Sequence, residues 1–441
     1  MSTEATMGAE NAGLPALDSA LTMRKVETDA IEQELDNSWR EANASAIAAG
    51  SHAGARNTVM TLVIYANTPS EARRALDTLS DPGAQAARAI VIVPTGATGA
   101  APIEAYIATR LQTQDGVASY GEEIVLMAHD DAVQHLPGTL LPLIVAGLPS
   151  YFWWMGEPPW RTELLESLVD SSDRLIVDTA AMYQPERSLL ALDDLTHRKQ
   201  SSCAISDLNS ARQAPWRELV AQFFDTPEML AYLRAVDQVS IEYAAGAEFA
   251  AEAPTNTGQA YLFAGWLASR LGWRAAGGVA ARGANDEREY TLLSGVNQRI
   301  KLQINARFGV VLKDRFDISQ TNIPIPTLAP AGANPAAHAH TGAASSVAPG
   351  ALMLVRLRAT VDGKIGSFTV AREADLEHAS TLCQLPQAQG SPPSKTVHLP
   401  TIGEAALLTE QLHQLEHDTL YEEALAAAAQ LLDPSVRRTR P

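Results

Sequence analysis

The sequence predicts an N-terminal α/β domain with a largely parallel sheet, followed by an α+β domain with an antiparallel sheet and a long C-terminal helix. Three observations favour this class. The chain has 441 residues, which exceeds the usual size of one domain, and 46% are hydrophobic, enough for two cores. In the first half, apolar runs alternate with helical segments, as in βα units. Beyond about residue 186 this alternation stops, and several β-branched runs and a hairpin signal follow.

The composition indicates three parts. Residues 1–56 are polar, Ala-rich and acidic, and the stretch VETDAIEQELDNSWREA predicts one short helix within this tail. Residues 57–185 form the predicted α/β domain, and residues 186–441 form the predicted α+β domain. Within the second domain, residues 323–350 are rich in Pro, Ala and Gly without periodicity, which predicts a low-complexity surface insertion.

The α/β domain is expected to begin with a strand in NTVMTLVIYA and a helix in TPSEARRALDTLS, capped by Thr68 or Ser70 near Pro69. ARAIVIVP is the next expected strand. The elements that follow alternate between helix and strand, in the order PIEAYIATRLQ (helix), EEIVLMAH (strand), LPGTLLPLIVAG (helix), SYFWW (strand), WRTELLESLVD (helix) and DRLIVDT (strand). Such alternation predicts a parallel sheet covered on both faces.

The α+β domain is expected to begin with helices in PWRELVAQFF and TPEMLAYLRAV, the second started by a capping box of Asp225 and Glu228. A strand in VDQVSIEYA precedes a helix in TGQAYLFAGWLASRLGW that Gly272 ends. The expected antiparallel strands are EYTLLSG, RIKLQINAR and the hairpin ALMLVRLRATVDGKIGSFTVARE, which turns at Asp362 and Gly363. Leucines at helical spacing predict one long helix over residues 403–432.

Charge and cysteine content narrow the function. The 33 Lys and Arg against 51 Asp and Glu give a net charge of −18, which repels nucleic-acid phosphates and anionic lipids. Residues 136–156 carry no charge, but their prolines and glycines would break a membrane-spanning helix. The N-terminus shows no secretory signal, and the scarcity of cysteine, Cys203 and Cys383 alone, suits a reducing compartment. We therefore expect a cytoplasmic protein with no nucleic-acid or membrane partner.

One motif resembles a zinc site. His413, Glu416 and His417 match H-x-x-E-H, in which two histidines hold zinc and the glutamate activates water. That chemistry needs a third protein ligand, and 441 − 417 leaves 24 residues to supply one. A solvated helix face is the preferred interpretation. We expect no metal.

Two further patterns lie where α/β domains bind ligands. The stretch VPTGATGAAP (93–102) is placed like a phosphate-cradling loop, but it lacks both the G-x-G-x-x-G pattern and a following Gly-Lys-Ser/Thr. His129, Asp130 and Asp131 end a predicted strand without a nucleophile motif nearby. A flexible connection and a helix start are the preferred interpretations, so no cofactor or catalytic residue is assigned. The alternative is a sugar-phosphate or nucleotide-binding enzyme, whole or degenerate, that uses Thr95–Gly99 and His129–Asp131.

The stretch LPSYFWWMGEPPW (148–160) is the most aromatic in the chain. Alternation along a strand would turn Trp153 inward and Trp154 outward, and the double proline would stiffen the turn that follows. Tryptophans on a rigid turn are typical anchors of protein interfaces. The predicted partner-binding residues here are Trp154, Glu157, Pro158, Pro159 and Trp160. A buried core is the alternative role of the aromatic residues.

A second segment, SDLNSARQAPWREL, combines residues that cap and turn with residues that bind. Asp207 and Asn209 are natural turn or cap residues. Arg212, Trp216 and Arg217 offer planar donors and an aromatic face, which suits a partner-binding surface. Domain packing is the alternative role.

Three segments together, LPSYFWWMGEPPW, SDLNSARQAPWRELVAQFFD and LFAGWLASRLGW, resemble the OpcA family of glucose-6-phosphate dehydrogenase assembly proteins. The resemblance covers roughly residues 57–310. It implies a non-catalytic partner that binds the oligomeric dehydrogenase of the oxidative pentose phosphate pathway and promotes its assembled, active state. Some members are controlled through cysteines. With Cys203 and Cys383 alone, a local dithiol switch is not expected here, whereas a single-thiol effect of Cys203 stays open.

Overall fold

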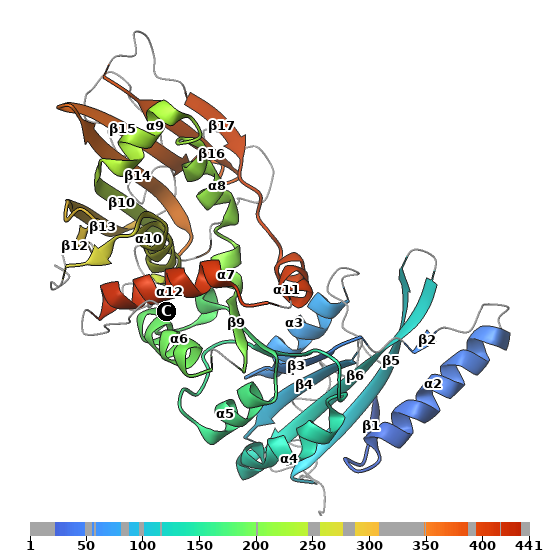
Figure 1. The fold of residues 1–441 in the computed structure, drawn as a ribbon. Helices are drawn as coiled ribbons and strands as arrows, with labels where there is room; N and C mark the ends of the chain where they lie inside the picture. Colours follow the sequence, from blue (N-terminus) through green and yellow to red (C-terminus); the bar gives the residue numbers. More distant parts are fainter. Residues whose placement is uncertain are drawn as a thin grey trace, which may run out of the picture. The chain divides into compact units, whose positions relative to one another are not determined.

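The structure is a computed structural model, shown in Figure 1. It describes residues 23–48, 55–56, 59–80, 88–96, 101–114, 117–199, 202–245, 256–276, 287–307, 348, 350–386, 394–414 and 416–433. The chain divides into two compact units. Unit 1 comprises Met1–Ala181, Arg198–Leu208 and Gly403–His417, and unit 2 comprises Met182–His197, Asn209–Ile402 and Asp418–Pro441. The domain limits predicted from the sequence stay a prediction, and most of the predicted insertion at 323–350 lies outside the described residues.

Unit 1 is built on a mostly parallel sheet with the strand order β1-β5-β6-β4-β3-β7-β8-β9, to which β2 adds by pairing with β6. Its strands are β1 (Arg24–Val26), β2 (Ala55–Arg56), β3 (Thr61–Tyr65), β4 (Arg88–Thr95), β5 (Ile103–Gln114), β6 (Val117–His129), β7 (Ser150–Trp154), β8 (Arg174–Val177) and β9 (Ala204–Asp207). All pairings from β6 through β4, β3, β7 and β8 to β9 are parallel. This confirms the predicted parallel sheet.

The parallel strands follow the order of doubly wound nucleotide-binding sheets. Numbered along the chain, β3, β4, β6, β7, β8 and β9 stand in the spatial order 3-2-1-4-5-6. The direction of winding reverses between β3 and β7, and at this switch point such sheets hold their ligands. All residues of β3, β7, β8 and β9 are buried, as expected for strands covered on both faces.

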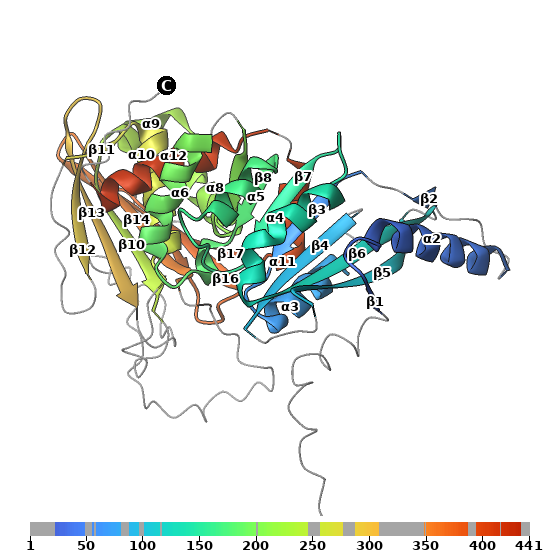
Figure 2. The same ribbon diagram turned by 90° about the horizontal axis from the view of Figure 1, so that it is seen from below.

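The helices of unit 1 form largely where the sequence predicts them. They are α2 (Ile31–Ala48), α3 (Pro69–Leu79), α4 (Leu136–Leu140), α5 (Glu163–Asp170) and α11 (Glu404–His413), with short 3₁₀ turns at Asp130–His135, Leu141–Leu143 and Thr179–Ala181. Helix α2 lies along β5, as Figure 2 shows. Within the described residues, no helix is long and apolar enough to cross a membrane.

The helix predicted in PIEAYIATRLQ is wrong, because this segment forms β5. The strand pairs antiparallel with β6 over its full length, with Ile107 opposite Ile124. Ala105 and Ile107 are buried while Tyr106 and Ala108 are half-buried, so burial has the period of two typical of a strand. The chain thus enters the third parallel strand through a hairpin rather than through a helix.

Unit 2 contains a sheet with the order β11-β12-β13-β10-β14-β15-β16-β17. Its strands are β10 (Val236–Ala244), β11 (Arg274–Ala275), β12 (Arg288–Leu293), β13 (Arg299–Arg307), β14 (Leu352–Val361), β15 (Lys364–Arg372), β16 (His378–Gln384) and β17 (Ser394–His398). Apart from the parallel pairing of β10 with β13, these pairings are antiparallel, which confirms the prediction. The hairpin turns where expected, with positive φ at Asp362 and Gly363.

The helices of unit 2 are α6 (Pro185–Lys199, whose last two residues count to unit 1), α7 (Leu208–Ala211, whose first residue also counts to unit 1), α8 (Ala214–Gln222), α9 (Pro227–Arg234), α10 (Gly258–Leu271) and α12 (Thr419–Leu432). Gly272 ends α10 with φ of 66°, as expected. The predicted capping box of Asp225 and Glu228 is wrong, because Thr226 occupies the N-cap of α9 without a side-chain hydrogen bond.

The chain has two helices, α11 and α12, where one long helix was expected. Helix α11 ends at His413, and Asp418 starts α12 by accepting a hydrogen bond from the backbone N–H of Tyr421 at 2.9 Å. A side chain that accepts at an N-cap favours a new helix start over continuation. Leucines at helical spacing occur both before and after this cap, so the sequence pattern predicted one helix instead of two.

Candidate functional site at the carboxyl edge of the parallel sheet

Open α/β sheets bind their ligands at the carboxyl ends of their strands. We therefore describe this edge of the unit 1 sheet first. Its residues follow β3, β4, β6, β7, β8 and β9. We use "carboxyl edge" for the described residues Asn67–Glu71, Thr95, His129–Asp131, Gly156–Trp160, Thr179 and Asp207.

The loop after β3 closes the helix end that would hold a phosphate. Thr68 caps α3 by accepting a hydrogen bond from the backbone N–H of Glu71 at 3.2 Å. The Glu71 carboxylate in turn accepts from the backbone N–H of Asn67 at 2.7 Å, and Pro69 removes one further donor. This arrangement differs from a capping box in that Glu71 bonds the residue before the N-cap. It places the chain's own carboxylate in the first turn of the helix whose start binds a pyrophosphate in doubly wound folds. The sequence predicts Thr68 or Ser70 as the cap near Pro69, and the structure confirms Thr68 in this role. The part of Glu71 was missed, although T-x-x-E directly after a strand is a recognisable signal.

An aromatic stack joins the last residues of β3 and β7, beside the switch point. The rings of Tyr65 and Trp154 are 4.0 Å apart and nearly parallel, at 17°. Beyond them, the backbone N–H of Met155 donates to the Tyr65 carbonyl at 3.0 Å, and the Asn67 amide donates to the Met155 carbonyl. A Cβ on Gly156 would lie 2.8 Å from the Asn67 amide nitrogen, so the packing here is tight.

The expectation that Trp154 points outward is wrong. Its exposed fraction is 0%, and that of Trp153 is 1%. Strand β7 lies between β3 and β8 in the interior of the sheet, where both faces are covered, so neighbouring side chains are buried on opposite sides. Trp154 therefore packs on Tyr65 and Phe152 rather than on solvent.

The turn after β7 is held rigidly at the surface. The Trp160 indole donates to the Glu157 carboxylate at 3.0 Å, and the Trp160 backbone N–H donates to the Pro158 carbonyl at 2.9 Å. Pro159 is exposed, Glu157 and Trp160 are half-buried, and Pro158 is buried. Of the five residues predicted in this stretch, Glu157, Pro159 and Trp160 thus reach the surface.

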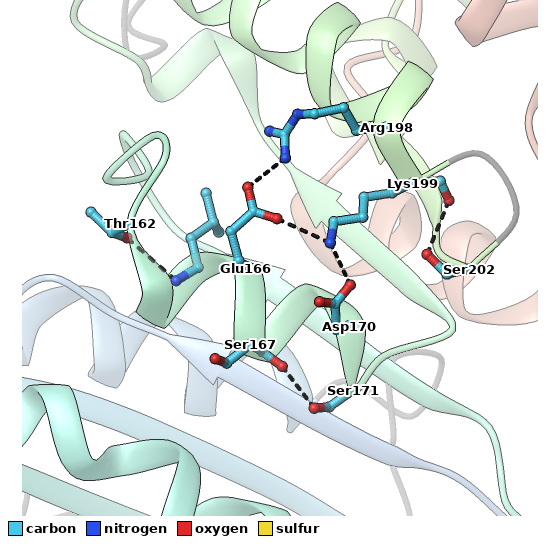
Figure 3. A network of polar contacts seen from close by, with 9 residues as sticks. Thr162, Glu166, Ser167, Asp170, Ser171, Arg198, Lys199 and Ser202 are labelled. Atoms are coloured by element: carbon cyan, nitrogen blue, oxygen red, sulfur yellow. Dashed lines mark hydrogen bonds and ion pairs between the residues drawn. The ribbon is translucent and has the colours of Figure 1, made fainter.

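Helix α5 follows this turn, and the Thr162 hydroxyl donates to the Pro159 carbonyl at 2.9 Å. Figure 3 shows the polar contacts of α5. Thr162 accepts from the backbone N–H of Leu165 at 3.4 Å and caps the helix. Further along α5, Glu166 pairs with Arg198 at 2.6 Å and with Lys199 at 3.0 Å. The turn is therefore anchored by strand β7 on one side and by a helix with its own ion pairs on the other.

The histidine at the end of β6 contacts the end of β4. The Thr95 hydroxyl and His129 Nδ1 are 2.7 Å apart, while Asp130 and Asp131 are exposed and start a 3₁₀ turn. Among the described residues, no group of His, Cys, Asp and Glu is arranged to hold a metal ion. Residues 97–100 of the alternative phosphate loop lie outside the described residues.

In the second predicted segment, five side chains divide between the two units. Asp207 belongs to unit 1, is 2% exposed, and accepts from the Thr179 backbone N–H at 3.0 Å and the Thr179 hydroxyl at 2.6 Å. It therefore ties the end of β9 to the loop after β8. Asn209 belongs to unit 2, is 0% exposed, and accepts from Gln259 at 2.8 Å. These two residues are structural contacts.

The remaining residues of that segment all lie in unit 2. Trp216 is buried, and the Arg372 guanidinium lies 5.7 Å from its ring centroid. Arg217 donates to the Ser210 carbonyl at 3.0 Å, and both Arg212 and Arg217 are half-buried. Trp216 thus packs in the core, and the two arginines are the members of this group that reach the surface.

The structure separates the residues of the H-x-x-E-H motif. His413 is the last residue of α11, whereas Glu416 and His417 follow it, so the H-x-x-E-H residues do not share a continuous helix.

Cys203 is buried, and burial raises the pKa of its thiol to about 12. A thiol with this pKa stays protonated and unreactive at neutral pH.

A cavity lies at the opposite, amino edge of the same sheet. Its volume is about 590 Å³, and it is lined by residues 144–151 with Asp173, Arg174 and Gln414. The Arg174 guanidinium donates to the Ser206 hydroxyl and to the Glu416 carbonyl, which holds the segment after α11 against β8 and β9.

Comparison with known proteins gives two family matches. The glucose-6-phosphate dehydrogenase subunit N-terminal domain matches residues 82–194, and the corresponding C-terminal domain matches residues 203–425. The chain is similar to OxPP cycle protein OpcA of Synechocystis, 38% identical over 34% of this chain and 30% of the relative, and to that of Nostoc punctiforme, 32% identical over 45% and 39%. The matched region spans about a third of the length of these curated relatives.

Solved structures show a weaker likeness. UDP-N-acetylglucosamine 3-dehydrogenase GnnA of Acidithiobacillus ferrooxidans is similar with a TM-score of 0.40 and 11% identity, covering 84% of this chain and 96% of that chain. A score this low does not establish a common fold.

Proposed function

Because the chain belongs to the OpcA family of glucose-6-phosphate dehydrogenase subunit proteins, we propose that it is a non-catalytic assembly factor that binds oligomeric glucose-6-phosphate dehydrogenase and activates it allosterically. The observation that carries the proposal is the match of both subunit domains, in order, over residues 82–194 and 203–425. The relatives named for the OxPP cycle support a place in the oxidative pentose phosphate pathway.

The geometry of the carboxyl edge supports a role without chemistry of its own. The Glu71 carboxylate lies in the first turn of α3, at the helix end where a pyrophosphate would bind, and a second negative charge there is repelled. The stack of Tyr65 on Trp154 and the contact of Asn67 with Met155 pack the ends of β3 and β7 tightly beside the switch point where a nucleotide would bind. A doubly wound sheet whose ligand position is closed in this way is suited to binding a protein with its surface.

The surface turn Gly156–Trp160 is the proposed contact in unit 1. Its exposed proline and hydrogen-bonded tryptophan lose little conformational freedom on docking, which favours affinity. In unit 2, Arg212 and Arg217 are the proposed contacts. Trp154, Pro158, Asp207, Asn209 and Trp216 support these surfaces from within. Activation requires tighter binding to the active dehydrogenase, and a tenfold change in substrate affinity needs a coupling of about 1.4 kcal/mol.

Size-exclusion chromatography with light scattering, using the dehydrogenase of the same organism, tests the proposal. We expect a complex larger than either protein and a rise in dehydrogenase activity that saturates with added chain. Trp160→Ala should weaken both effects, while Trp39→Ala, a half-buried tryptophan of α2, should leave them unchanged. The absence of a complex at micromolar concentrations would refute the proposed function.

The strand order favours one alternative function. In this alternative the chain is an enzyme, whole or degenerate, that binds a sugar phosphate or a nucleotide. A ligand at a hundred times its dissociation constant adds about 2.7 kcal/mol to stability. Thermal shift with NADP, ATP and glucose 6-phosphate therefore separates the two. A closed carboxyl edge predicts no shift with any of them.

A further inference from the structure

The cavity at the amino edge of the unit 1 sheet is large enough for a small molecule. Its volume of about 590 Å³ lies within the usual range of small-molecule sites. We call it the amino-edge cavity. It is lined by the loop 144–149, the first residues of β7 and β8, Asp173 and Gln414, which all belong to unit 1. The cavity is therefore a feature of one compact unit.

The loop 144–149 gives the cavity an apolar wall of fixed shape. The Leu148 backbone N–H donates to the Val145 carbonyl at 3.3 Å, and Gly147 has φ of 80°, as in a type II turn. The Val145 backbone N–H donates to the Thr61 hydroxyl at 3.3 Å, which ties the loop to β3. The half-buried aliphatic side chains of the wall are Ile144, Val145, Leu148 and Pro149. Such a wall suits an apolar group of a ligand.

Asp173 adds a carboxylate that is held in place. Its Oδ2 accepts from the Ser150 backbone N–H at 2.7 Å and from the Ser150 hydroxyl at 3.0 Å. The Asp173 side chain is exposed, and its Oδ1 has no hydrogen-bond partner within the described part of the chain. A carboxylate that is fixed through one oxygen and exposed to solvent is a ready acceptor for an ammonium group.

Tyr151 and Gln414 add uncharged donors to the lining. Neither side chain has a hydrogen-bond partner among the residues that the structure describes. Tyr151 is 2% exposed, yet its hydroxyl is not one of the fully enclosed polar atoms, so it reaches the cavity. Gln414 is half-buried. A phenol and an amide can both donate to a ligand carboxylate.

Arg174 adds a positive charge beside these groups. Its guanidinium is buried and donates to the Ser206 hydroxyl and the Glu416 carbonyl. Burial raises the pKa of Tyr151, the charge of Arg174 lowers it, and the charge of Asp173 raises it. Two opposite charges therefore act at the Tyr151 hydroxyl. A ligand with a single charge would be repelled by one of them, whereas a ligand with both signs is attracted by both.

We propose that the amino-edge cavity binds a zwitterionic α-amino acid with a large apolar side chain. The ammonium group meets the Asp173 carboxylate, and the ligand carboxylate accepts from the Tyr151 hydroxyl and the Gln414 amide. The Arg174 charge favours the ligand carboxylate without a direct hydrogen bond. The apolar side chain packs on the loop 144–149, and the cavity volume suits a large one.

Isothermal titration calorimetry with phenylalanine, using the chain without the dehydrogenase, tests the ligand class. We expect saturable binding at one site. Phenylalaninamide lacks the carboxylate and 3-phenylpropanoate lacks the ammonium group, so each should bind about tenfold more weakly or worse. Equal affinity for all three compounds would overturn the assignment of charges. No binding of phenylalanine or leucine at about 10 mM would overturn the proposal.

Tyr151→Phe tests the site itself, because it removes one hydroxyl that has no partner within the described chain. The melting temperature should stay equal or rise, and the affinity for phenylalanine should fall about tenfold. Tyr120→Phe makes the same change at a buried tyrosine of β6 outside the lining, and it should leave the affinity unchanged. An unchanged affinity in Tyr151→Phe would refute the assigned site.

A last comparison separates this inference from the proposed function. If glucose 6-phosphate binds the parent chain and Tyr151→Phe abolishes that binding, the cavity takes an anion and the proposed ligand class is wrong. Because the titrations contain no dehydrogenase, their failure leaves the proposed assembly role untouched. Conversely, a chain that binds phenylalanine but forms no complex with the dehydrogenase would keep the amino-edge site and refute only the assembly role.

Discussion

Replacing Gly265 by alanine should destabilise unit 2, although the same change usually stabilises a helix. Gly265 lies in α10, where this helix packs on α12. A Cβ at this position would lie 2.1 Å from the Ala424 carbonyl oxygen and 2.9 Å from the Ala428 backbone nitrogen. Both atoms belong to the backbone of α12, so no side-chain rotation relieves the clash.

The two contributions have opposite signs. Alanine has a higher helix propensity than glycine by about 1 kcal/mol. To restore a separation of 3.0 Å from 2.1 Å, α12 must move by 3.0 − 2.1 = 0.9 Å, which loosens the packing along both helices. Overpacking of this kind costs about 3 kcal/mol at the upper end of its usual range. The net loss is therefore about 2 kcal/mol, or a decrease of about 4–8 °C in melting temperature for a unit of this size.

Thermal unfolding followed by tryptophan fluorescence measures this effect, because Trp266 lies in the same helix. Gly138→Ala is the matched control, since Gly138 also lies in a helix and a Cβ there would meet nothing within 4 Å. It should leave the melting temperature equal or slightly higher. A Gly265→Ala protein as stable as the parent would refute the close approach of α10 and α12.

Three further substitutions test other contacts. Trp154→Ala should destabilise the protein by about 3–5 kcal/mol, because it empties a buried site next to Tyr65; an unchanged melting temperature would contradict the stack. Cys203→Ser should not change the number of thiols that a disulfide reagent titrates in the native protein at pH 8, since the pKa of Cys203 is about 12; a loss of one thiol would show that it is reactive. Glu104→Gln should reduce the loss of folding stability that occurs as the pH falls. The hydrogen bond from Lys25 lowers the pKa of Glu104, so its contribution is present above the unfolded pKa of about 4.3 and is lost as pH falls through the lower folded value. Because Lys25 is 54% exposed, the effect on the free energy of unfolding should stay below about 1 kcal/mol. The measurement is the melting temperature of variant and parent at each pH from 7 to 3, and an equal decrease in both proteins would contradict the prediction.

The class of both sheets follows from local patterns in the sequence. Continuous apolar runs such as TLVIY and RLIV predict strands buried on both faces, and the structure buries every residue of β3 and β8. The Asp362–Gly363 dipeptide predicts its hairpin because both residues tolerate positive φ. Where local patterns are ambiguous, prediction fails, as in β5, whose apolar residues fit either period.

The residues of the candidate site depend on contacts that the sequence does not display. The side chains of β7 alternate between the two faces of the sheet, but this alternation does not tell whether one face or both are covered. Trp154 is buried because β7 lies between β3 and β8 in the interior of the sheet. Asp207 and Asn209 are polar and lie in a turn, but their side chains bond to Thr179 and Gln259, which are distant in sequence.

The sequence by itself determined most element types, apart from β5 and the break between α11 and α12, together with the parallel and antiparallel character of the two sheets. It also carried a family resemblance in three aromatic and arginine-rich segments. Only the tertiary structure decided that the Glu71 carboxylate binds the loop before α3 and that Trp154 is buried against Tyr65. The reason is physical. Secondary structure is set by neighbours along the chain, whereas the exposure and charge balance of a side chain are set by residues that folding brings beside it.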